Sequence, residues 1–195
     1  MKQFRNRALP ALAVLSLLLG AQAAPAFAAG KAMNEHTVMV GGAPMYPSKN
    51  IVENAVNSKD HTTLVAAVKA AGLVDTLSGP GPFTVFAPTN AAFAALPAGT
   101  VDTLLKPENK AALTKVLTYH VVSGRMSAHD LTAAVKRGGG KATLTTVEGE
   151  PLIVMQSGKQ LWVQDAQGNK AQVTIGDVMQ SNGVIHVVDK VLMPK

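Results

Sequence analysis

The segment PFTVFAPTNAAF, residues 82–93, combines a strand, a proline and a helix start within a few positions. Residues 83–87 are apolar, aromatic and β-branched, which predicts a short buried strand. Pro88 has no backbone N–H and so ends the ladder of that strand. Thr89 or Asn90 supplies a side-chain oxygen that caps a helix, which the alanines after them favour. Each residue of the junction has a structural role, and none is a nucleophile paired with a base.

Outward from this junction, helical patterns precede it and strand patterns follow it. Asn50, with Glu53 three residues later, predicts a capped helix, and Asp60 is predicted to cap a second helix that ends at Gly72. After a glycine run at 138–140, five short strands are predicted, separated by turn residues: 141–147, 151–156, 160–165, 171–175 and 184–188. Helices followed by strands predict an α+β fold rather than alternating βαβ units.

The composition of the chain excludes some classes of function but does not identify one. The chain has 195 residues, no cysteine and a formal net charge of +6. The basic residues are spread out, and one Trp and two Tyr accompany them, which does not resemble a nucleic-acid binding surface. Without cysteine there are no disulfides, so packing alone must stabilise the domain.

The N-terminal residues have the pattern of a secretory signal peptide over residues 1–28. Three basic residues precede an apolar run at 8–19, and Ala26-Phe27-Ala28 follows as a cleavage site. The run is too short to span a bilayer. We therefore expect a protein that is secreted, extracellular or periplasmic, without membrane insertion. Residues 29–47, rich in Gly, Pro and Met, predict an extended N-terminal arm before a single domain over residues 48–195.

Three ordered motifs carry a family resemblance. They are FTVFAPTNAAFAALP at 83–97, the pair Tyr119-His120, and NGVIHVVDKVLMP at 182–194. In their order and separation, these motifs resemble those of the fasciclin domain, and the resemblance covers roughly residues 48–194. The first and last motifs resemble the two signature boxes of that family. The resemblance implies a fasciclin-like wedge of β-sheets with helices packed against them. It also implies a non-enzymatic module for cell adhesion or matrix contact.

The resemblance further implies which residues contact a partner, here a cell-surface or matrix protein or polysaccharide. The Tyr-His region of animal relatives is linked to integrin contact, which carries over by position to Tyr119 and His120. A second adhesive segment in relatives reads Glu-Pro-Asp-Ile-Met. The aligned residues here read IGDVM at 175–179, so Asp177 and Met179 match, whereas Glu-Pro is replaced by Ile-Gly.

Residue chemistry gives little support to catalysis, a metal or a cofactor. His120 and His186 each lie in apolar surroundings, which favours a ring hydrogen-bonded inside the core. The five histidines lack metal-ligand spacing, and no G-x-S-x-G elbow is present. We therefore expect no catalytic residues, no metal site and no cofactor. Two alternatives stay open: an extracytoplasmic carrier of a small apolar ligand in a crevice between helices and sheet, and an uncharacterised hydrolase.

Overall fold

The computed structural model describes residues 36–195, so the predicted signal peptide and residues 29–35 of the predicted arm lie outside the described residues. The helical segments are α1 (Ile51–Ala55), the 3-10 turn η1 (Lys59–His61), α2 (Thr62–Ala71), α3 (Val74–Ser78), α4 (Asn90–Ala94), α5 (Thr100–Leu104), the 3-10 turn η2 (Pro107–Asn109), α6 (Lys110–Tyr119) and α7 (Ala128–Arg137). The strands are β1 (Val38–Val40), β2 (Ala43–Met45), β3 (Phe83–Pro88), β4 (Val121–Ser123), β5 (Lys141–Thr145), β6 (Pro151–Ser157), β7 (Gln160–Gln164), β8 (Lys170–Gln180) and β9 (Gly183–Val188).

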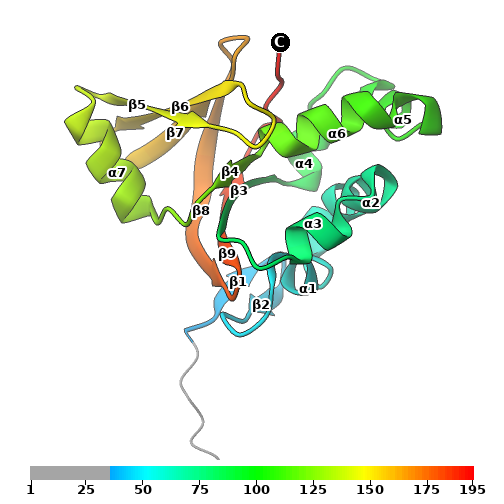
Figure 1. Cartoon of the computed structure of the whole chain (residues 1–195), viewed down its shortest axis with the longest axis horizontal. Coiled ribbons are helices and arrows are strands. Elements are labelled where there is room, and N and C mark those ends of the chain that lie inside the picture. The colour runs from blue at the N-terminus through cyan, green and yellow to red at the C-terminus, as the bar shows by residue number, and fades with distance from the viewer. Residues whose placement is uncertain (1–35) are drawn as a thin grey trace, which may run out of the picture. The chain divides into compact units, whose positions relative to one another are not determined.

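Seven of these strands form one sheet in the order β4-β3-β9-β8-β7-β6-β5. The pairs are antiparallel except β3 with β9, whose parallel register joins the first and last predicted motifs. The two end strands approach each other, because Val122 bridges Thr146 and the Val147 N–H donates to the Val121 carbonyl at 2.7 Å. The sheet therefore curls into a wedge that is nearly closed, and the α+β prediction is confirmed (Figure 1).

Two apolar clusters fill the space on either side of the central strands. One cluster lies between β3, β8 and β9 and the helices α1, α2, α4 and α6; the other lies under α7 and among β5, β6 and β7. In β3, Val85 and Ala87 face the first cluster, whereas Phe86 faces the second. Strand alternation explains this division and why the stretch is apolar on both faces. In Figure 1 α1–α6 gather beside one part of the sheet, and α7 lies against β5 and β6.

The prediction of an extended arm is wrong for residues 38–45, which form the antiparallel hairpin β1–β2. Gly41 and Gly42 both have positive φ, 58° and 76°, as a two-residue hairpin turn requires. Val40 and Met45 are buried in the first apolar cluster, so this segment belongs to the domain. The glycines of this segment, which contribute to the prediction of an extended arm, instead form a hairpin turn.

Most of the predicted helix ends are confirmed, and one is wrong. Asn50 forms the capping box with Glu53, Gly72 ends α2 at φ 73°, and the Thr89 side chain accepts from the Ala92 N–H at 3.2 Å. Asp60 does not cap α2. It lies within η1, because the chain adds a 3-10 turn before α2 begins at Thr62.

Strand β8 is longer than the predicted 171–175 and continues through Asp177 to Gln180. Its pairing with β9 shifts register between Val173 and Ile175, and again between Ile175 and Val178. Asp177 lies in the second irregularity with φ 56°, the one described residue other than glycine with a positive φ. The strand bends at this bulge instead of ending. The first residues of β8 therefore pair with β7, and the rest of the strand pairs with β9.

Candidate functional site

Tyr119, the last residue of α6, lies wholly inside the second apolar cluster. Its hydroxyl donates to the Pro151 carbonyl at 2.9 Å and accepts from the Ala166 N–H at 2.8 Å. Burial raises the pKa of this phenol to about 12, so it stays protonated. Tyr119 therefore connects α6 to the start of β6 and to the turn after β7.

His120, which ends α6, is also buried. Its Nε2 accepts from the Leu192 N–H at 2.9 Å, which places the ring proton on Nδ1, and Nδ1 donates to the Val116 carbonyl at 2.8 Å. Burial lowers the pKa of His120 to about 4, so the ring is neutral at physiological pH. Both ring nitrogens are hydrogen-bonded to backbone groups, which confirms the prediction that His120 is a hydrogen-bonded histidine of the core.

The structure thus places the predicted contact pair Tyr119 and His120 where no partner reaches it in this conformation. The reason is the helical period: the buried face of α6 carries Leu113, Val116 and Leu117, and His120 follows on the same face. A direct contact by these two side chains is incompatible with their burial. They position the elements around them.

Asp177 lies 49 positions along the chain from the start of α7, yet its Oδ1 accepts from the Ala128 N–H at 2.6 Å. Ala128 is the first residue of α7, so the carboxylate satisfies one of the free N–H groups at that helix end. Asp177 is half-buried and is followed by the buried Val178 and the half-buried Met179. Of the predicted residues, Asp177 thus lies in the bulge and Met179 follows it in the regularly paired part of β8, opposite Val184, and both are half-buried.

His186 supports this bulge from inside. Its Nε2 donates to the Met126 carbonyl at 2.8 Å, and Nδ1 faces the Asp177 N–H at 3.4 Å. The ring stacks on Phe86 with 5.6 Å between the ring centres, and burial lowers its pKa. The structural role predicted for His186 is confirmed by these contacts.

The segment between β4 and α7 is fixed to the same place. The Arg125 guanidinium donates to the carbonyls of Gln180 and Ser181 at 3.1 and 3.0 Å, just after the bulge. The Met126 N–H donates to the Thr84 hydroxyl at 2.9 Å. We call Arg125, Asp177 and Met179 the bulge surface. The sequence did not reveal Arg125, because its partners lie more than 50 positions away.

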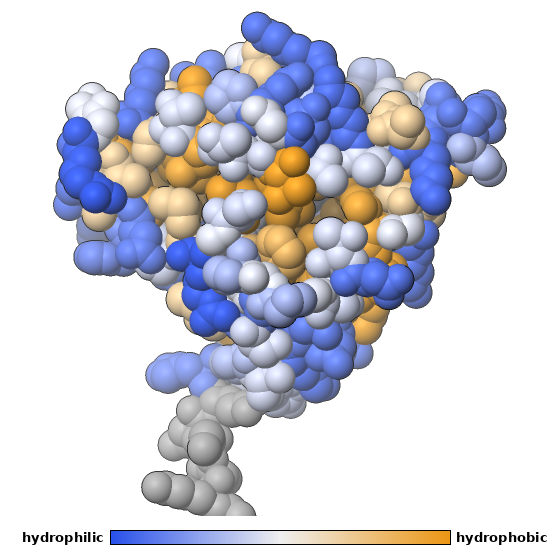
Figure 2. Space-filling model, in the orientation of Figure 1, coloured by the Kyte–Doolittle hydropathy of each residue, from blue (hydrophilic) through white to orange (hydrophobic). Residues whose placement is uncertain are grey.

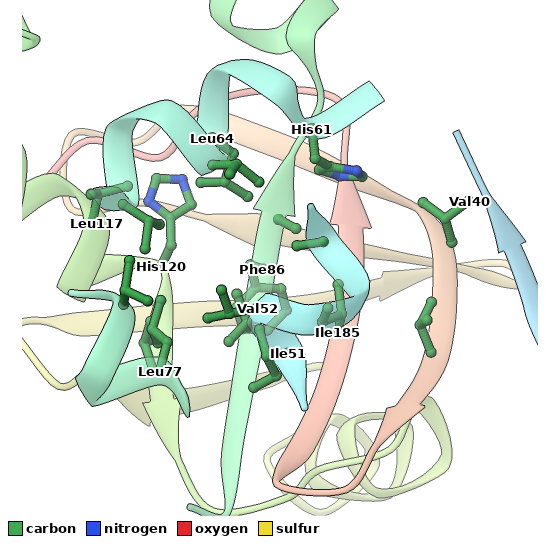
Figure 3. Close-up of a pocket in the computed structure, with 18 of the residues that line it drawn as sticks. Val40, Ile51, Val52, His61, Leu64, Leu77, Phe86, Leu117, His120 and Ile185 are labelled. Carbon is green, nitrogen blue, oxygen red and sulfur yellow. The ribbon is translucent and has the colours of Figure 1, made fainter. Parts of the chain in front are cut away.

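An apolar cavity of about 50 Å³ lies between the helices α1, α2 and α3 and the strands β3 and β9. Its walls include Ile51, Leu64, Val85 and Ile185, with His61 and His120 among them (Figure 3). Room for one water takes roughly 10–15 Å³ on this scale, so the cavity holds only a few heavy atoms. It is far smaller than pockets for drug-sized ligands.

Ser58 and His61 form a hydroxyl–imidazole contact, with 2.9 Å between Oγ and Nδ1. Within residues 36–195 no carboxylate hydrogen-bonds to this ring, and Ser58 does not line the cavity. The pair therefore lacks the third member and the access that a hydrolytic triad needs. In the same residues no three His, Asp or Glu side chains are grouped so as to hold a metal ion.

Comparisons with known proteins agree with this geometry. The family model described as the fasciclin domain matches residues 59–194. Protein sll1483 of Synechocystis sp. is 51% identical over 161 residues, which is 82% of each chain. The cell surface glycolipoprotein MPB83 of Mycobacterium bovis is 38% identical over 145 residues, 72% of this chain and 58% of the relative.

A solved structure has the same fold. It is a FAS1 domain pair from the insect cell adhesion molecule fasciclin I, with a TM-score of 0.67 and 18% sequence identity. The match covers 76% of this chain and 52% of the solved chain, so this chain spans about half of that pair. In the described part of the present chain, no helix has the length and apolar character that crossing a bilayer requires.

Proposed function

This chain belongs to the fasciclin domain family, and on that premise we propose that it is a secreted, non-enzymatic module for adhesion to a protein or polysaccharide of a cell surface or matrix. One relative is named as a cell surface glycolipoprotein, and the solved structure of the same fold comes from a cell adhesion molecule. Those names describe those proteins, and they support the same class of role here.

The bulge surface is the contact region that we propose, and the rigid presentation of Asp177 carries the proposal. The residue keeps a positive φ in mid-strand, and its carboxylate is fixed against α7. A non-glycine residue in this conformation costs free energy and persists only where its surroundings hold it. Side chains that are already ordered lose little entropy when a partner binds.

The bulge surface also combines the types of group that recognition uses. Arg125 is exposed and is bonded to the carbonyls at the end of β8, while Asp177 and Met179 of the same strand are half-buried. Arginine and methionine are enriched in interfaces, where they combine charge-assisted hydrogen bonds with adaptable apolar contact. Tyr119 and His120 contribute indirectly, because they hold α6 and the turn after β7 in place.

The test is attachment of the purified protein to intact cells and to matrix-coated surfaces over a salt series. Asp177→Asn retains an oxygen for the Ala128 N–H but removes the charge, and Met179→Ala shortens the apolar side chain. We expect saturable binding that each substitution weakens by about ten-fold, as at a contact hot spot. Glu108→Gln, a charge change at an exposed residue of η2, is the matched control and should bind as the parent does.

Thermal melting first establishes that each variant is folded. Attachment that fades with salt equally in all four proteins would indicate unspecific charge attraction and contradict the proposal. Saturable attachment that is unchanged by Asp177→Asn and Met179→Ala would place the contact elsewhere and reject the bulge surface.

A further inference from the structure

One face of the sheet points away from both apolar clusters. In β5, β6 and β7 buried residues alternate with exposed or half-buried ones, and the buried ones face the second cluster under α7. The antiparallel register places the outward side chains in rows across the strands. One row is Lys141, Met155, Trp162 and Gln172. The row beside it contains Ile153, Gln164 and Lys170. We call these two rows the outer sheet face.

Three large apolar side chains of this face lie outside the core. Ile153, Met155 and Trp162 are half-buried, yet they pack against neither apolar cluster of the described residues. Apolar groups elsewhere on the surface are edges of the core. Those that Figure 2 shows where α3 faces α6 adjoin the first cluster, which Val74 of α3 contacts. Core packing therefore does not account for Trp162 and its two apolar neighbours.

The polar groups beside these apolar side chains have no protein partner. Within residues 36–195 the indole N–H of Trp162 has no acceptor, and it is open to solvent, because the one enclosed side-chain atom without a hydrogen bond is Nε2 of His61. The side-chain amides of Gln164 and Gln172 also make no hydrogen bond to this part of the chain. Each amide carries two donor hydrogens and an acceptor oxygen. The face thus combines a flat aromatic ring with unpaired groups that can bind hydroxyls.

The charge of this face is positive. Lys141 and Lys170 lie at the ends of its two rows, and Lys159 lies in the turn between β6 and β7. All three are exposed, and in residues 36–195 the ion pairs are those of Lys115, so none of the three is paired. Residues 141–147, 151–164 and 170–176 contain no Asp or Glu. Unpaired charges of one sign attract an anionic partner.

An open hollow of about 600 Å³ adjoins the outer sheet face at the paired residues Ile153 and Gln164. Ligand pockets have volumes of roughly 300–1,000 Å³, so the hollow has room for part of a bound molecule. Its two carboxylates are already engaged. Glu150 pairs with Lys115 at 3.3 Å, and buried Asp165 accepts from backbone N–H groups. The hollow therefore extends the surface without adding a free negative charge.

We propose that the outer sheet face binds an acidic polysaccharide, whose sugar rings carry carboxylates. The C–H groups of a sugar ring pack on the indole of Trp162. The ring hydroxyls bond to the amides of Gln164 and Gln172. The carboxylates are attracted to Lys141 and Lys170, and charge-assisted hydrogen bonds hold them there. Four strands about 4.8 Å apart make each row roughly 14 Å long, which suits an extended chain.

This surface uses other residues than the bulge surface, and its binding is measured in solution without attachment to cells. The inference adds a second contact to the proposed adhesive role and does not rest on the first. Either proposal therefore stands if the other fails.

Two tetrasaccharides with the same backbone test the inference: cellotetraose, and its analogue in which each CH₂OH is oxidised to a carboxylate. Trp162 is the one tryptophan of the chain, so its fluorescence reports on this face alone. Each sugar is titrated into the purified protein. We expect a saturable change in fluorescence, with the acidic sugar bound about ten-fold more tightly, as one charge-assisted hydrogen bond gives. Added salt should reduce this difference.

Variants separate the contribution of charge from that of the aromatic ring. Lys141→Gln combined with Lys170→Gln should weaken the acidic sugar about ten-fold and leave cellotetraose unchanged. Lys59→Gln combined with Lys106→Gln, at exposed sites on the helical side, is the matched control and should bind as the parent does. Trp162→Leu, followed by calorimetry because it lacks the fluorophore, should abolish binding of both sugars.

Three results would overturn the inference. One is the absence of a saturable fluorescence change with either sugar. Another is equal affinity of the parent protein for the two sugars. The third is equally tight binding of a glutamate oligomer with the same number of carboxylates, which would make the face a site for any polyanion. The double lysine variant retains Trp162, so the test remains decisive even if Trp162→Leu does not fold.

Discussion

At the scale of the residue, burial decides what the histidines do. His61, His120 and His186 all lie in apolar surroundings, and burial lowers the pKa of each. Removing an imidazolium from water is unfavourable, so each ring is neutral, and His120 and His186 each use both ring nitrogens as a fixed donor and acceptor. The same burial makes Tyr119 a connector through its hydroxyl. The Tyr-His pair is thus a buried structural unit at the end of α6.

The lowered pKa of His120 predicts a pH dependence of stability. The folded pKa is about 4 and the unfolded value is about 6.5, so the unfolded chain binds more protons between these values. The stabilisation is therefore complete above pH 6.5 and is lost as pH falls toward 4. From pH 7 to pH 5 we expect His120 alone to lower the free energy of unfolding by about 2 kcal/mol. Urea unfolding at several pH values measures this.

His61 and His186 also make the folded state less stable as pH falls, because burial lowers the pKa of each. His120→Gln should flatten the dependence on pH even if it lowers stability overall. His129→Gln, at an exposed position on α7, should leave the slope unchanged. An identical slope in the parent and in His120→Gln would contradict the assignment.

At the scale of the element, short side chains define where helices start and where β8 bends. Thr89 begins α4 directly after β3, so the chain turns from strand to helix without a loop. Asp177 likewise links two elements, because it is both the bulge of β8 and the acceptor at the start of α7. A change at either position therefore affects two elements at once.

Thr89→Ala should lower the free energy of unfolding by about 1 kcal/mol, because the Ala92 N–H loses its acceptor. Thr89→Ser keeps the hydroxyl and should restore most of this loss. Thr103→Ala removes a hydroxyl from an exposed site in α5 and serves as the control with little effect. Chemical unfolding of the four proteins gives the comparison, and equal losses in Thr89→Ala and Thr89→Ser would argue against a capping role.

At the scale of the whole molecule, Asn182 joins the helical side of the domain to the sheet. Its side-chain oxygen accepts from the Ile51 N–H at 3.0 Å, and its amide donates to the carbonyls of Leu77 and Gly79, both at 2.8 Å. One buried side chain at the start of the last signature motif thus holds α1 and the end of α3 against the turn before β9.

Asn182→Ala should lower the free energy of unfolding by about 3 kcal/mol, because each buried group left unpaired costs roughly 1–3 kcal/mol. Asn57→Ala is the matched control, since Asn57 is exposed and its side-chain amide donates to the nearby Glu53 carbonyl, four positions earlier. Urea unfolding compares the two variants with the parent. A loss in Asn182→Ala no larger than in Asn57→Ala would show that these three bonds do not join the elements.

The sequence by itself determined two things about this protein: its local structure and the family that it resembles. Residues 82–93 predicted β3 and the start of α4, Asn50 and Gly72 predicted helix ends, and glycine-bounded apolar runs predicted the strands after 140. These features depend on neighbours a few positions apart, so hydrogen bonding, capping and backbone preference act on them directly. The resemblance of three ordered motifs then implied the wedge, which the structure confirms.

Tertiary structure alone decided which residues are exposed and which distant groups meet. Tyr119 and His120 are buried because α6 turns its apolar face inward, and Asp177 lies in a bulge because β8 must pair along two neighbours. Arg125 became a candidate contact residue only through carbonyl partners that the folded chain brings close to it. Exposure and contact between distant segments are properties of packing, and a linear pattern carries them only indirectly.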